Sequence, residues 1–547
     1  MKITVSNKIY EFDEDMTLLE LARRLYPEDY TKYFGAIIDN TIFNLHHILY
    51  KDEVVDFIDL KTDDGYKILT RTMTLILALA LKRLDPQALL QVEHFIGEGL
   101  YFEIEGISKI DKALVQKLKA KMQEVIAENL SLKRHVMPID EANQLFEAEG
   151  YWEKVKLLNT LALKQVDVYL VAGHAFSFHG YLAPSTGFAK DFELELYHPG
   201  IIMTFPSPQS GGQVPAFVEE KSLAKIFSAS KRWTQMQGIG YAASLNRAVL
   251  ADGAESLIEI TEAYFENSLS RVADGICSDK EANFILIAGP SSSGKTTTAK
   301  RLAVQLAVRG KRPLSISVDD YFIDRERTPK NEKGDPDFES IYAVDLDAFN
   351  EDLVALMEGE QVRLPKFDFK TGTRSISDQV IQMDEEHPVI IEGIHALNPI
   401  LTCDVPEKNK FKIYISALTQ LNLDAHNRIS VTDVRLLRRI VRDHHHRNNT
   451  AEQTLRTWYN VRAGEEKWIF PYQGEADVHL DTSLIYELAV LKKHVMPLLQ
   501  SVDQSCGCYK DAKRLMKFLE YFLEIRDDSP IPYHSILREF IGRRTLG

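Results

Sequence analysis

Cysteine is scarce in this sequence, because four residues among 547 cannot form the framework of a disulfide-stabilised scaffold. Cys277 and Cys403 are isolated, whereas one residue separates Cys506 from Cys508. No second pair of cysteines completes the ligand set of a structural zinc site. We therefore predict that all four are reduced structural thiols.

Long hydrophobic runs are also missing. The longest, Leu75–Leu81, is much shorter than the ~20 apolar residues that cross a bilayer. The start of the chain, Met1–Val5, alternates like a strand and lacks the apolar core of a signal peptide. These absences predict a soluble, cytoplasmic protein without a membrane partner.

Positive charge is in deficit, with 65 lysines and arginines against 80 aspartates and glutamates and a net charge of −15. A general phosphate-backbone binder needs clustered positive charge, so an extended nucleic-acid surface is disfavoured, although a local basic patch remains compatible with this balance. The hydrophobic (45%) and charged (27%) fractions are ordinary for globular proteins. At roughly 100–200 residues per domain, the length predicts about three or four domains.

The order of alternating, helical and apolar segments predicts five regions. Two α+β regions, 1–62 and 63–220, precede a helical connector over 221–280. Residues 281–490 are expected to form an α/β domain with a doubly wound parallel sheet. Residues 491–547 complete the chain as a helical region.

The α/β prediction depends on a strand, a helix and a second strand in close succession. The unbroken apolar run Phe284–Ala288 is typical of a buried parallel strand. A helical pattern extends to Val308, and a second strand is expected at Leu314–Val318, which together make a βαβ unit. Further buried strands are expected at Val389–Ile391 and Phe411–Ile415.

The segment between that first strand and the helix, Gly289–Thr296, matches the pattern G-x-x-x-x-G-K-[ST] without a mismatch. In this motif the backbone wraps the phosphates, the lysine places a positive charge on the β- and γ-phosphates, and the threonine hydroxyl is a Mg²⁺ ligand. The dipole of the following helix favours the same anion. We predict that ATP or GTP binds here with Mg²⁺. The residues expected to hold the nucleotide are Gly289, Pro290, Ser291, Ser292, Ser293, Gly294, Lys295, Thr296 and Thr297.

Two carboxylates follow predicted strands of the same sheet. Asp319 comes directly after the second strand and lies at the carboxyl edge, where it could accept the proton of an attacking hydroxyl. Glu392 ends the strand at Val389–Ile391, the usual position of a Mg²⁺-organising carboxylate. Taken singly, an N-cap or turn aspartate and an exposed strand-end glutamate are alternative interpretations.

A helical segment near the end of this region carries four arginines. Arg435, Arg438, Arg439 and Arg442 recur at intervals of three and four residues, with leucine, isoleucine and valine between them. Such a stripe suits a lid that closes over phosphates, and a solvated basic face is the alternative. The consecutive histidines 444–446 do not share a helix face, so we expect them to be solvated.

Together these motifs resemble uridine kinase and the wider phosphoribulokinase/uridine kinase family of P-loop kinases, over about residues 283–485. The resemblance implies that Asp319 is the catalytic base and that Glu392 and Thr296 organise Mg²⁺. It further implies that positive side chains neutralise the transferred phosphoryl group and contact the substrate. The resemblance assigns neutralisation of the phosphoryl group to Lys295, Arg435 and Arg438, and contact with the substrate to Arg439.

The resemblance extends to the substrate side. Phe322 takes the position of an aromatic that flanks the nucleoside, and Asp345 that of a ribose-binding aspartate. Residues 364–369 are similar to a base-packing P-x-Y-D-F segment in which Phe367 replaces the tyrosine. Gly372 stands where uridine kinases tend to have a base-contacting histidine, and this departure weakens the expectation of uridine as the substrate.

Residues 1–200 resemble threonyl-tRNA synthetase. Residues 1–62 are similar to a TGS domain, a β-grasp module linked to RNA or nucleotide ligands, and residues 66–200 to the editing-type second domain, most clearly at Pro184–Gly187. The H-x-x-x-H motif of that domain is missing between Thr72 and Ala80. No class II aminoacylation core follows, since the P-loop region takes its place.

Two residues stand where the editing-type domain carries its later cysteine and histidine. These are Phe178 and Leu182, which cannot ligate a metal or activate water. The resemblance therefore implies that the hydrolytic site is absent from this chain.

These observations predict a cytoplasmic, Mg²⁺-dependent kinase that transfers the γ-phosphoryl group of ATP or GTP to the 5′-hydroxyl of a ribonucleoside. A kinase of the same family with a sugar phosphate acceptor is one alternative. A tRNA- or RNA-binding regulatory protein that uses nucleotide as a switch is another. The predicted partners are a nucleoside substrate and, as open alternatives, an RNA or nucleotide ligand of the amino-terminal half and a second copy of the chain.

Overall fold

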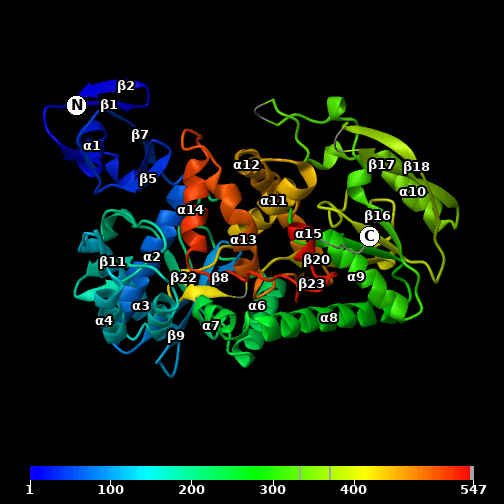
Figure 1. Ribbon diagram of the computed structural model, residues 1–547, viewed down its shortest axis with the longest axis horizontal. Helices are drawn as coiled ribbons and strands as arrows, with labels where there is room; N and C mark the ends of the chain where they lie inside the picture. Colours follow the sequence, from blue (N-terminus) through cyan, green and yellow to red (C-terminus); the bar gives the residue numbers. More distant parts are fainter. Residues whose placement is uncertain (332–333, 369–370, 420, 543–547) are drawn as a thin grey trace.

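The computed structural model describes residues 1–331, 334–368, 371–419 and 421–542. The amino-terminal sheets lie at one end of the molecule and the parallel sheet with its helices at the other (Figure 1). Within the described ranges, none of the helices combines the length and the apolar composition needed to cross a membrane.

The first 62 residues form a five-stranded sheet in the order β2-β1-β7-β4-β5, crossed by one helix. Strands β1 and β7 are parallel and the other pairs are antiparallel. Thr17 caps the helix together with Glu20 in a reciprocal capping box. The elements are β1 (Lys2–Val5), β2 (Lys8–Glu11), β3 (Met16–Thr17), α1 (Leu18–Leu25), β4 (Gly35–Ile38), β5 (Thr41–Asn44), β6 (Ile48–Leu49) and β7 (Glu53–Ile58).

The next region contains a four-stranded sheet, a three-stranded sheet and four helices, and it shares one hydrophobic core with the first region, from Ile3 to Phe205. Helix α2 begins at Asp63, because Thr62 caps it by accepting the N–H of Gly65. The elements are α2 (Asp63–Leu84), β8 (Leu89–Ile96), β9 (Gly99–Glu105), α3 (Lys112–Ala127), β10 (Arg134–Pro138), α4 (Ile139–Glu149), α5 (Trp152–Asn159), β11 (Gln165–Val171), β12 (His174–Phe176), β13 (Glu193–Tyr197) and β14 (Gly200–Thr204).

The carboxyl-terminal half contains the predicted parallel sheet, with strand order β16-β19-β15-β20-β23. The strands are β15 (Phe284–Ala288), β16 (Leu314–Ser317), β19 (Val389–Glu392), β20 (Lys410–Ser416) and β23 (Val478–Asp481). Each neighbouring pair is parallel. Ile285 and Ile287 face one hydrophobic core while Phe284 and Leu286 face another, so helices cover both faces and the doubly wound prediction is confirmed.

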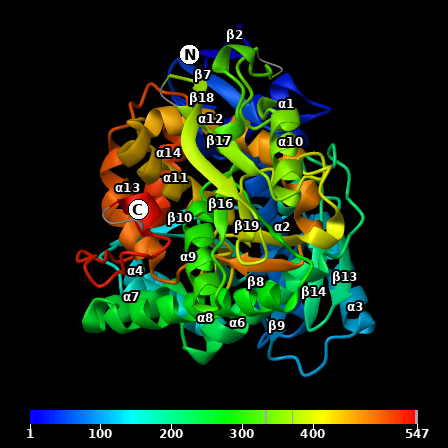
Figure 2. The ribbon, with the colours of Figure 1, turned by 90° about the vertical axis from the view of Figure 1, so that its right-hand side faces the viewer.

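Helices surround this sheet, and Figure 2 shows α9, the edge strand β16 and its neighbour β19 beneath a long hairpin. The helices are α9 (Lys295–Val308), α10 (Leu346–Met357), α11 (Val431–Arg447), α12 (Ala451–Trp468) and α13 (Glu487–Gln500), and the 3₁₀ turn η3 (Val318–Tyr321) follows β16. The hairpins are β17 (Gln361–Asp368) with β18 (Thr373–Gln382), and β21 (Asn422–Asp424) with β22 (Asn427–Arg428).

The connector and the carboxyl-terminal helices pack on the core of the parallel sheet. They are α6 (Lys221–Met236), α7 (Ala242–Asp252), α8 (Glu255–Ser278), α14 (Tyr509–Leu519) and α15 (Arg538–Ile541). Buried Arg301 of α9 pairs with Glu262 (3.4 Å) and Glu266 of α8. Since a buried guanidinium left without its acids is costly, the connector is part of the kinase-like half.

The two halves interlock through the β21–β22 hairpin. The N–H of Val92 donates to the carbonyl of Ala425 (2.8 Å). Asn427 accepts from the N–H of His179 (2.7 Å), and its side-chain amide donates to the carbonyl of Ser177 (2.9 Å). The amino-terminal half therefore packs directly on the half that carries the phosphate loop.

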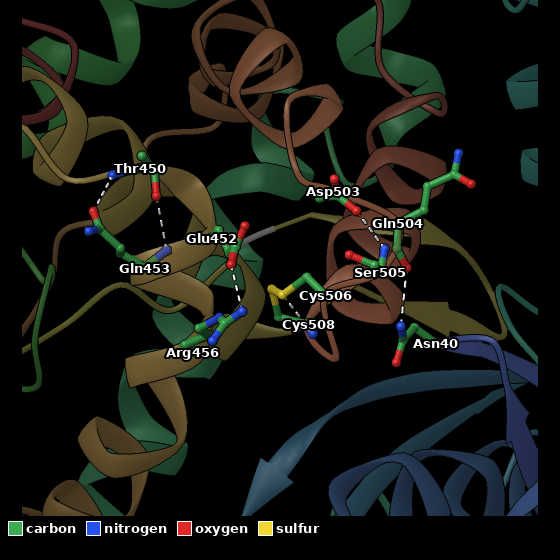
Figure 3. The surroundings of a disulfide bond; sticks show 10 residues. All are labelled: Asn40, Thr450, Glu452, Gln453, Arg456, Asp503, Gln504, Ser505, Cys506 and Cys508. Carbon is green, nitrogen blue, oxygen red and sulfur yellow. Dashed lines mark hydrogen bonds and ion pairs between the residues drawn. A yellow bond between two sulfur atoms is a disulfide. The ribbon is translucent and has the colours of Figure 1, made fainter.

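Cys506 and Cys508 form a disulfide in the turn before α14, so the prediction of reduced thiols is wrong for this pair (Figure 3). The short spacing allows both sulfurs to meet within one turn, a pairing that the count of cysteines did not reveal. The side-chain amide of Asn40 donates to the carbonyl of Gln504 in the same turn (3.1 Å). Cys277 and Cys403 are free thiols.

Candidate active site

The predicted phosphate loop connects β15 to α9. A Cβ at Gly289 would collide with the carbonyl oxygen of Ile415, and Gly294 adopts φ +90°, so both positions require glycine. The ammonium of Lys295 donates to the carbonyls of Gly289 (2.9 Å) and Pro290 (3.2 Å) across the loop. The strand–loop–helix context that the motif needs is therefore present.

The two predicted Mg²⁺ ligands meet at the carboxyl edge of the sheet. The Thr296 hydroxyl donates to Oε1 of Glu392 (3.3 Å), and the Ser317 hydroxyl donates to the same oxygen (3.1 Å). Ser317 and Glu392 end the neighbouring strands β16 and β19, which brings their side chains together. Thr296 reaches the same place from the first turn of α9. A hydroxyl beside a carboxylate is the hard oxygen donor set that Mg²⁺ prefers.

Asp319 lies at the start of η3, among the charges of the loop. Burial raises the pKa of Asp319, and the positive charges of Lys295 and Arg447 oppose that shift. Burial, aided by the charge of Asp319, raises the pKa of Glu392 to about 7. Burial lowers the pKa of Lys295, while Glu392 and Asp319 oppose it. The raised pKa values mean that burial and mutual repulsion disfavour the ionised forms of these two carboxylates. A divalent cation between them would stabilise the ionised forms.

The neighbouring Asp320 is directed elsewhere. Its carboxylate accepts the backbone N–H of Phe367 in the β17 strand (3.2 Å). The two aspartates therefore separate, Asp319 toward Lys295 and Asp320 toward the hairpin.

The structure corrects the prediction that Arg435 and Arg438 lie over the transferred phosphoryl group. They are 1% and 0% exposed and pair with the buried acids Glu465 and Glu487, the latter at 2.6 Å. Their remaining nitrogens reach backbone carbonyls of the phosphate loop at 2.9 and 3.4 Å. Helix α11 packs against α12, α13 and α15, so this part of the stripe is covered and braces the loop from behind.

The other predicted arginines are less deeply buried, and they interact with the Ser291 side chain and with the charge of Asp319. Arg439 donates to the Ser291 hydroxyl (2.6 Å) and pairs with Asp443 (3.3 Å). Arg442 and Arg447 also pair with Asp443, at 2.9 and 3.7 Å, and both act on the charge of Asp319. Sequence reasoning missed Arg447, although its spacing of four from Asp443 was a usable signal. The histidines 444–446 are exposed, as predicted.

The two predicted base-contacting aromatics are brought together, but inside the core. Phe322 and Phe367 are each 5% exposed, and their rings meet edge to face with centroids 5.7 Å apart. They can form the floor of an acceptor site rather than stacking freely on a base. Phe369, in the same predicted segment, lies outside the described residues.

Asp345, the predicted ribose ligand, has local partners. Its carboxylate caps α10 by accepting the N–H of Ala348 (3.2 Å) and pairs with Arg374 (2.6 Å). Gly372 adopts φ +75°, and a Cβ there would meet the Arg325 side chain at 2.8–2.9 Å. Arg325 thus lies against Gly372, the position at which uridine kinases tend to have a base-contacting histidine.

A carboxylate from the far end of the chain reaches the phosphate loop, and no local motif indicated it. Glu539 of α15 accepts the N–H of Thr297 (3.2 Å) and its hydroxyl (2.6 Å). Ile536 packs against Gly294 in the same place, and Figure 1 shows α15 beside the start of α9. The negative charge therefore sits on the helix N-terminus that the nucleotide phosphates are expected to use.

Replacing Glu539 by glutamine should tighten ATP binding by about three- to tenfold, because one negative charge leaves the anion-binding end of α9. Glutamine keeps an oxygen that accepts both hydrogen bonds. Isothermal titration with ATP and Mg²⁺ measures the change, with Glu520→Gln at an exposed position as the charge-matched control. Weaker ATP binding in Glu539→Gln would instead make this carboxylate part of the Mg²⁺ site.

The residues at the positions of the missing editing ligands belong to the core of the amino-terminal half. Phe178 and Leu182 are buried, and the hydroxyl of buried Thr72 accepts the N–H of Ala183 (2.9 Å). Hydrophobic side chains and a satisfied hydroxyl thus fill this position.

Comparisons with known proteins agree with this division of the chain. Residues 284–484 match the model of the "Phosphoribulokinase / Uridine kinase family". The threonine–tRNA ligase of Clostridium kluyveri is 30% identical over 196 residues, which are 36% of this chain and 31% of the ligase. The ligase of Clostridium botulinum strain Okra has the same identity and coverage. The chain thus spans about a third of the length of these relatives (31%).

Among solved structures, that of a possible uridine kinase from Bacillus stearothermophilus is 18% identical, with a TM-score of 0.26, and covers 39% of this chain and 98% of that chain. Residues 284–484 are a domain of the phosphoribulokinase/uridine kinase family, joined to an amino-terminal region that is similar to part of threonine–tRNA ligase.

Proposed function

We propose that this protein is a phosphotransferase that moves the γ-phosphoryl group of ATP or GTP to a hydroxyl of a small acceptor, in the first place the 5′-hydroxyl of a ribonucleoside. One observation carries the proposal. Lys295, Thr296, Asp319 and Glu392 converge where β15, β16 and β19 end beside the phosphate loop. Phosphoryl transfer needs this combination of phosphate cradle, cation site and base.

Each residue has a distinct role in this mechanism. The loop amides and Lys295 hold the β- and γ-phosphates, and Arg439 and Arg442 add positive charge from α11. Asp319 accepts the proton of the acceptor hydroxyl as that oxygen attacks the γ-phosphorus. The bond from the γ-phosphorus to the β-phosphate oxygen breaks in the same step, and ADP or GDP leaves. Thr296 and Glu392 would hold Mg²⁺, which when bound neutralises charge on the phosphate oxygens.

A second candidate acceptor, a sugar phosphate, is favoured by the charges on the acceptor side. Arg374 pairs with Asp345, yet its Nη1 is buried and has no hydrogen-bond partner within the described ranges. Arg325 lies against Gly372 next to it, and Arg327 acts on the charge of Asp345. Two guanidiniums that act on Asp345, with a third beside Gly372, suit an acceptor that already carries a phosphate.

Release of ADP from ATP, or of GDP from GTP, in the presence of Mg²⁺ tests the proposal. The acceptors are the four ribonucleosides and a set of pentose and hexose monophosphates, each with and without tRNA. Turnover that depends on a nucleoside supports the first acceptor, and turnover with a sugar phosphate the second. Nucleotide hydrolysis that responds only to tRNA would overturn the kinase proposal in favour of a nucleotide-switched RNA-binding protein.

A further inference from the structure

A cavity of about 370 Å³ lies where the amino-terminal half meets α11, α14 and the β21–β22 hairpin. Figure 1 shows α14 beside the amino-terminal sheet and α2, away from the phosphate loop. Residues of the loop do not line this cavity, so it is distinct from the nucleotide site proposed above.

The walls of this junction cavity carry an excess of positive charge, in contrast to the acidic chain as a whole. Nine lysines and arginines line it against four aspartates. On α2, Lys67 and Arg71 are four residues apart and share a face, and on α14 the basic residues recur at the same spacing. The basic residues of α14 are Lys510, Lys513, Arg514 and Lys517.

The aspartates neutralise only part of this charge. Arg514 pairs with Asp433 (2.6 Å), Lys517 with Asp167 (2.8 Å), and Lys510 with Asp64. Against the opposing effect of burial, Arg514 holds the pKa of Asp433 at about 2. These pairs fix α14 against α2, α11 and β11.

Four cations remain outside this network. In the part of the chain that the structure describes, Lys67, Arg71, Arg428 and Lys513 form no ion pair. Arg71 uses Nε on the carbonyl of Tyr181 (2.9 Å), and burial lowers its pKa to about 10. The cavity thus holds more cations than acids, and burial partly desolvates Arg71 and Arg428. Such an excess of positive charge is expected to attract an anion with several charges.

Aromatic rings form the rest of the wall. Tyr66, Phe95, Tyr181 and Phe518 line the cavity, and the guanidinium of Arg428 lies 4.7 Å from the centroid of Phe95. Such rings offer flat surfaces for a heterocyclic base. The volume is in the range of small-molecule sites, which fits one nucleotide rather than a strand.

We propose that the junction cavity binds a free nucleotide, with its phosphates on Lys67, Arg71, Arg428 and Lys513 and its base against the aromatic wall. The ligand would contact the amino-terminal half, α14 and β22 at once. The net charge of −15 disfavours an extended nucleic acid at the same place.

Isothermal titration of the full-length protein with ADP tests this proposal. Two binding events per chain are expected, one at the phosphate loop and one in the cavity. In the double variant Lys67→Gln/Lys513→Gln, one of them should weaken by about tenfold or more, because two charge-assisted contacts are lost. ADP binding at the phosphate loop should keep its affinity in this double variant. It should weaken instead in Lys295→Ala.

The control is Lys112→Gln/Lys117→Gln, which removes the same charge from exposed positions on α3. Circular dichroism checks that both double variants stay folded. A single ADP-binding event per chain in the wild type, or a second one that Lys67→Gln/Lys513→Gln leaves unchanged, would overturn the proposal. So would a short single-stranded RNA that loses affinity in this variant while ADP does not, which would assign the cavity to nucleic acid.

Discussion

Asp319→Asn is expected to lower kcat by roughly 10²–10⁴-fold, the usual contribution of a general base. Asparagine keeps the shape and can form a hydrogen bond, but it does not take up the acceptor proton. ATP affinity should change little, because Lys295, Thr296 and the loop amides are untouched. Steady-state kinetics with the acceptor found in the nucleoside and sugar phosphate panel measures the loss.

The adjacent aspartate is the matched control. Asp320 accepts the N–H of Phe367, and asparagine can accept it as well, so Asp320→Asn should retain most of the activity. The reverse ranking would assign the base to Asp320. If both variants kept wild-type kcat, the aspartates would be structural and the proposed mechanism would be wrong.

A change in pH dependence should accompany the loss in Asp319→Asn. The charge of Asp319 helps to raise the pKa of Glu392 to about 7, so removing that charge lowers this pKa and leaves Glu392 ionised at lower pH. Mg²⁺-dependent ATP binding should then persist to lower pH than in the wild type. Titration with ATP and Mg²⁺ between pH 5 and 8 would show it.

Lys295→Ala is expected to reduce turnover by about 10³-fold or more, since it removes the cation that the transferred phosphoryl group approaches. The half-buried ammonium also bridges the carbonyls of Gly289 and Pro290. Its loss removes the Lys295 donor from the Gly289 carbonyl, whereas the Pro290 carbonyl keeps the N–H of Ser293 (3.2 Å), and it should cost roughly 1–3 kcal/mol of stability. Thermal unfolding and ADP release separate the two effects.

A control variant at a solvent-exposed lysine, Lys280→Ala, should leave both activity and Tm unchanged. A protein that keeps near-wild-type turnover after Lys295→Ala would contradict the assignment of the phosphate loop. A variant that unfolds at the assay temperature is tested at a lower temperature, where the folded fraction is restored.

Local patterns were sufficient for much of the site. The G-x-x-x-x-G-K-[ST] motif lies between an apolar strand and a helix, so its position followed from contiguous residues. Asp319 and Glu392 are 73 positions apart, yet their meeting was also predictable, because the carboxyl ends of parallel strands lie on one edge of a sheet.

The arginine helix shows where such reasoning stops. Periodicity showed that Arg435, Arg438 and Arg439 share a region of one helix surface, but not what covers it. The partners of the buried pair, Glu465 and Glu487, come from other helices. A spacing rule contains no information about those helices. Arg435 and Arg438, which support the phosphate loop from its buried side, were therefore wrongly predicted to belong to a lid.

By itself, the sequence determined the phosphate loop, the parallel strands and the two carboxylates at their ends, because neighbouring residues and a regular sheet specify these features. Only the tertiary structure showed that Glu539 accepts a hydrogen bond from Thr297 beside the phosphate loop, and that Lys67 and Lys513 line the same cavity. Those residues are hundreds of positions apart. Their proximity depends on how the two halves and the carboxyl-terminal helices pack, and that packing is set by the shape of the assembled core rather than by any local pattern.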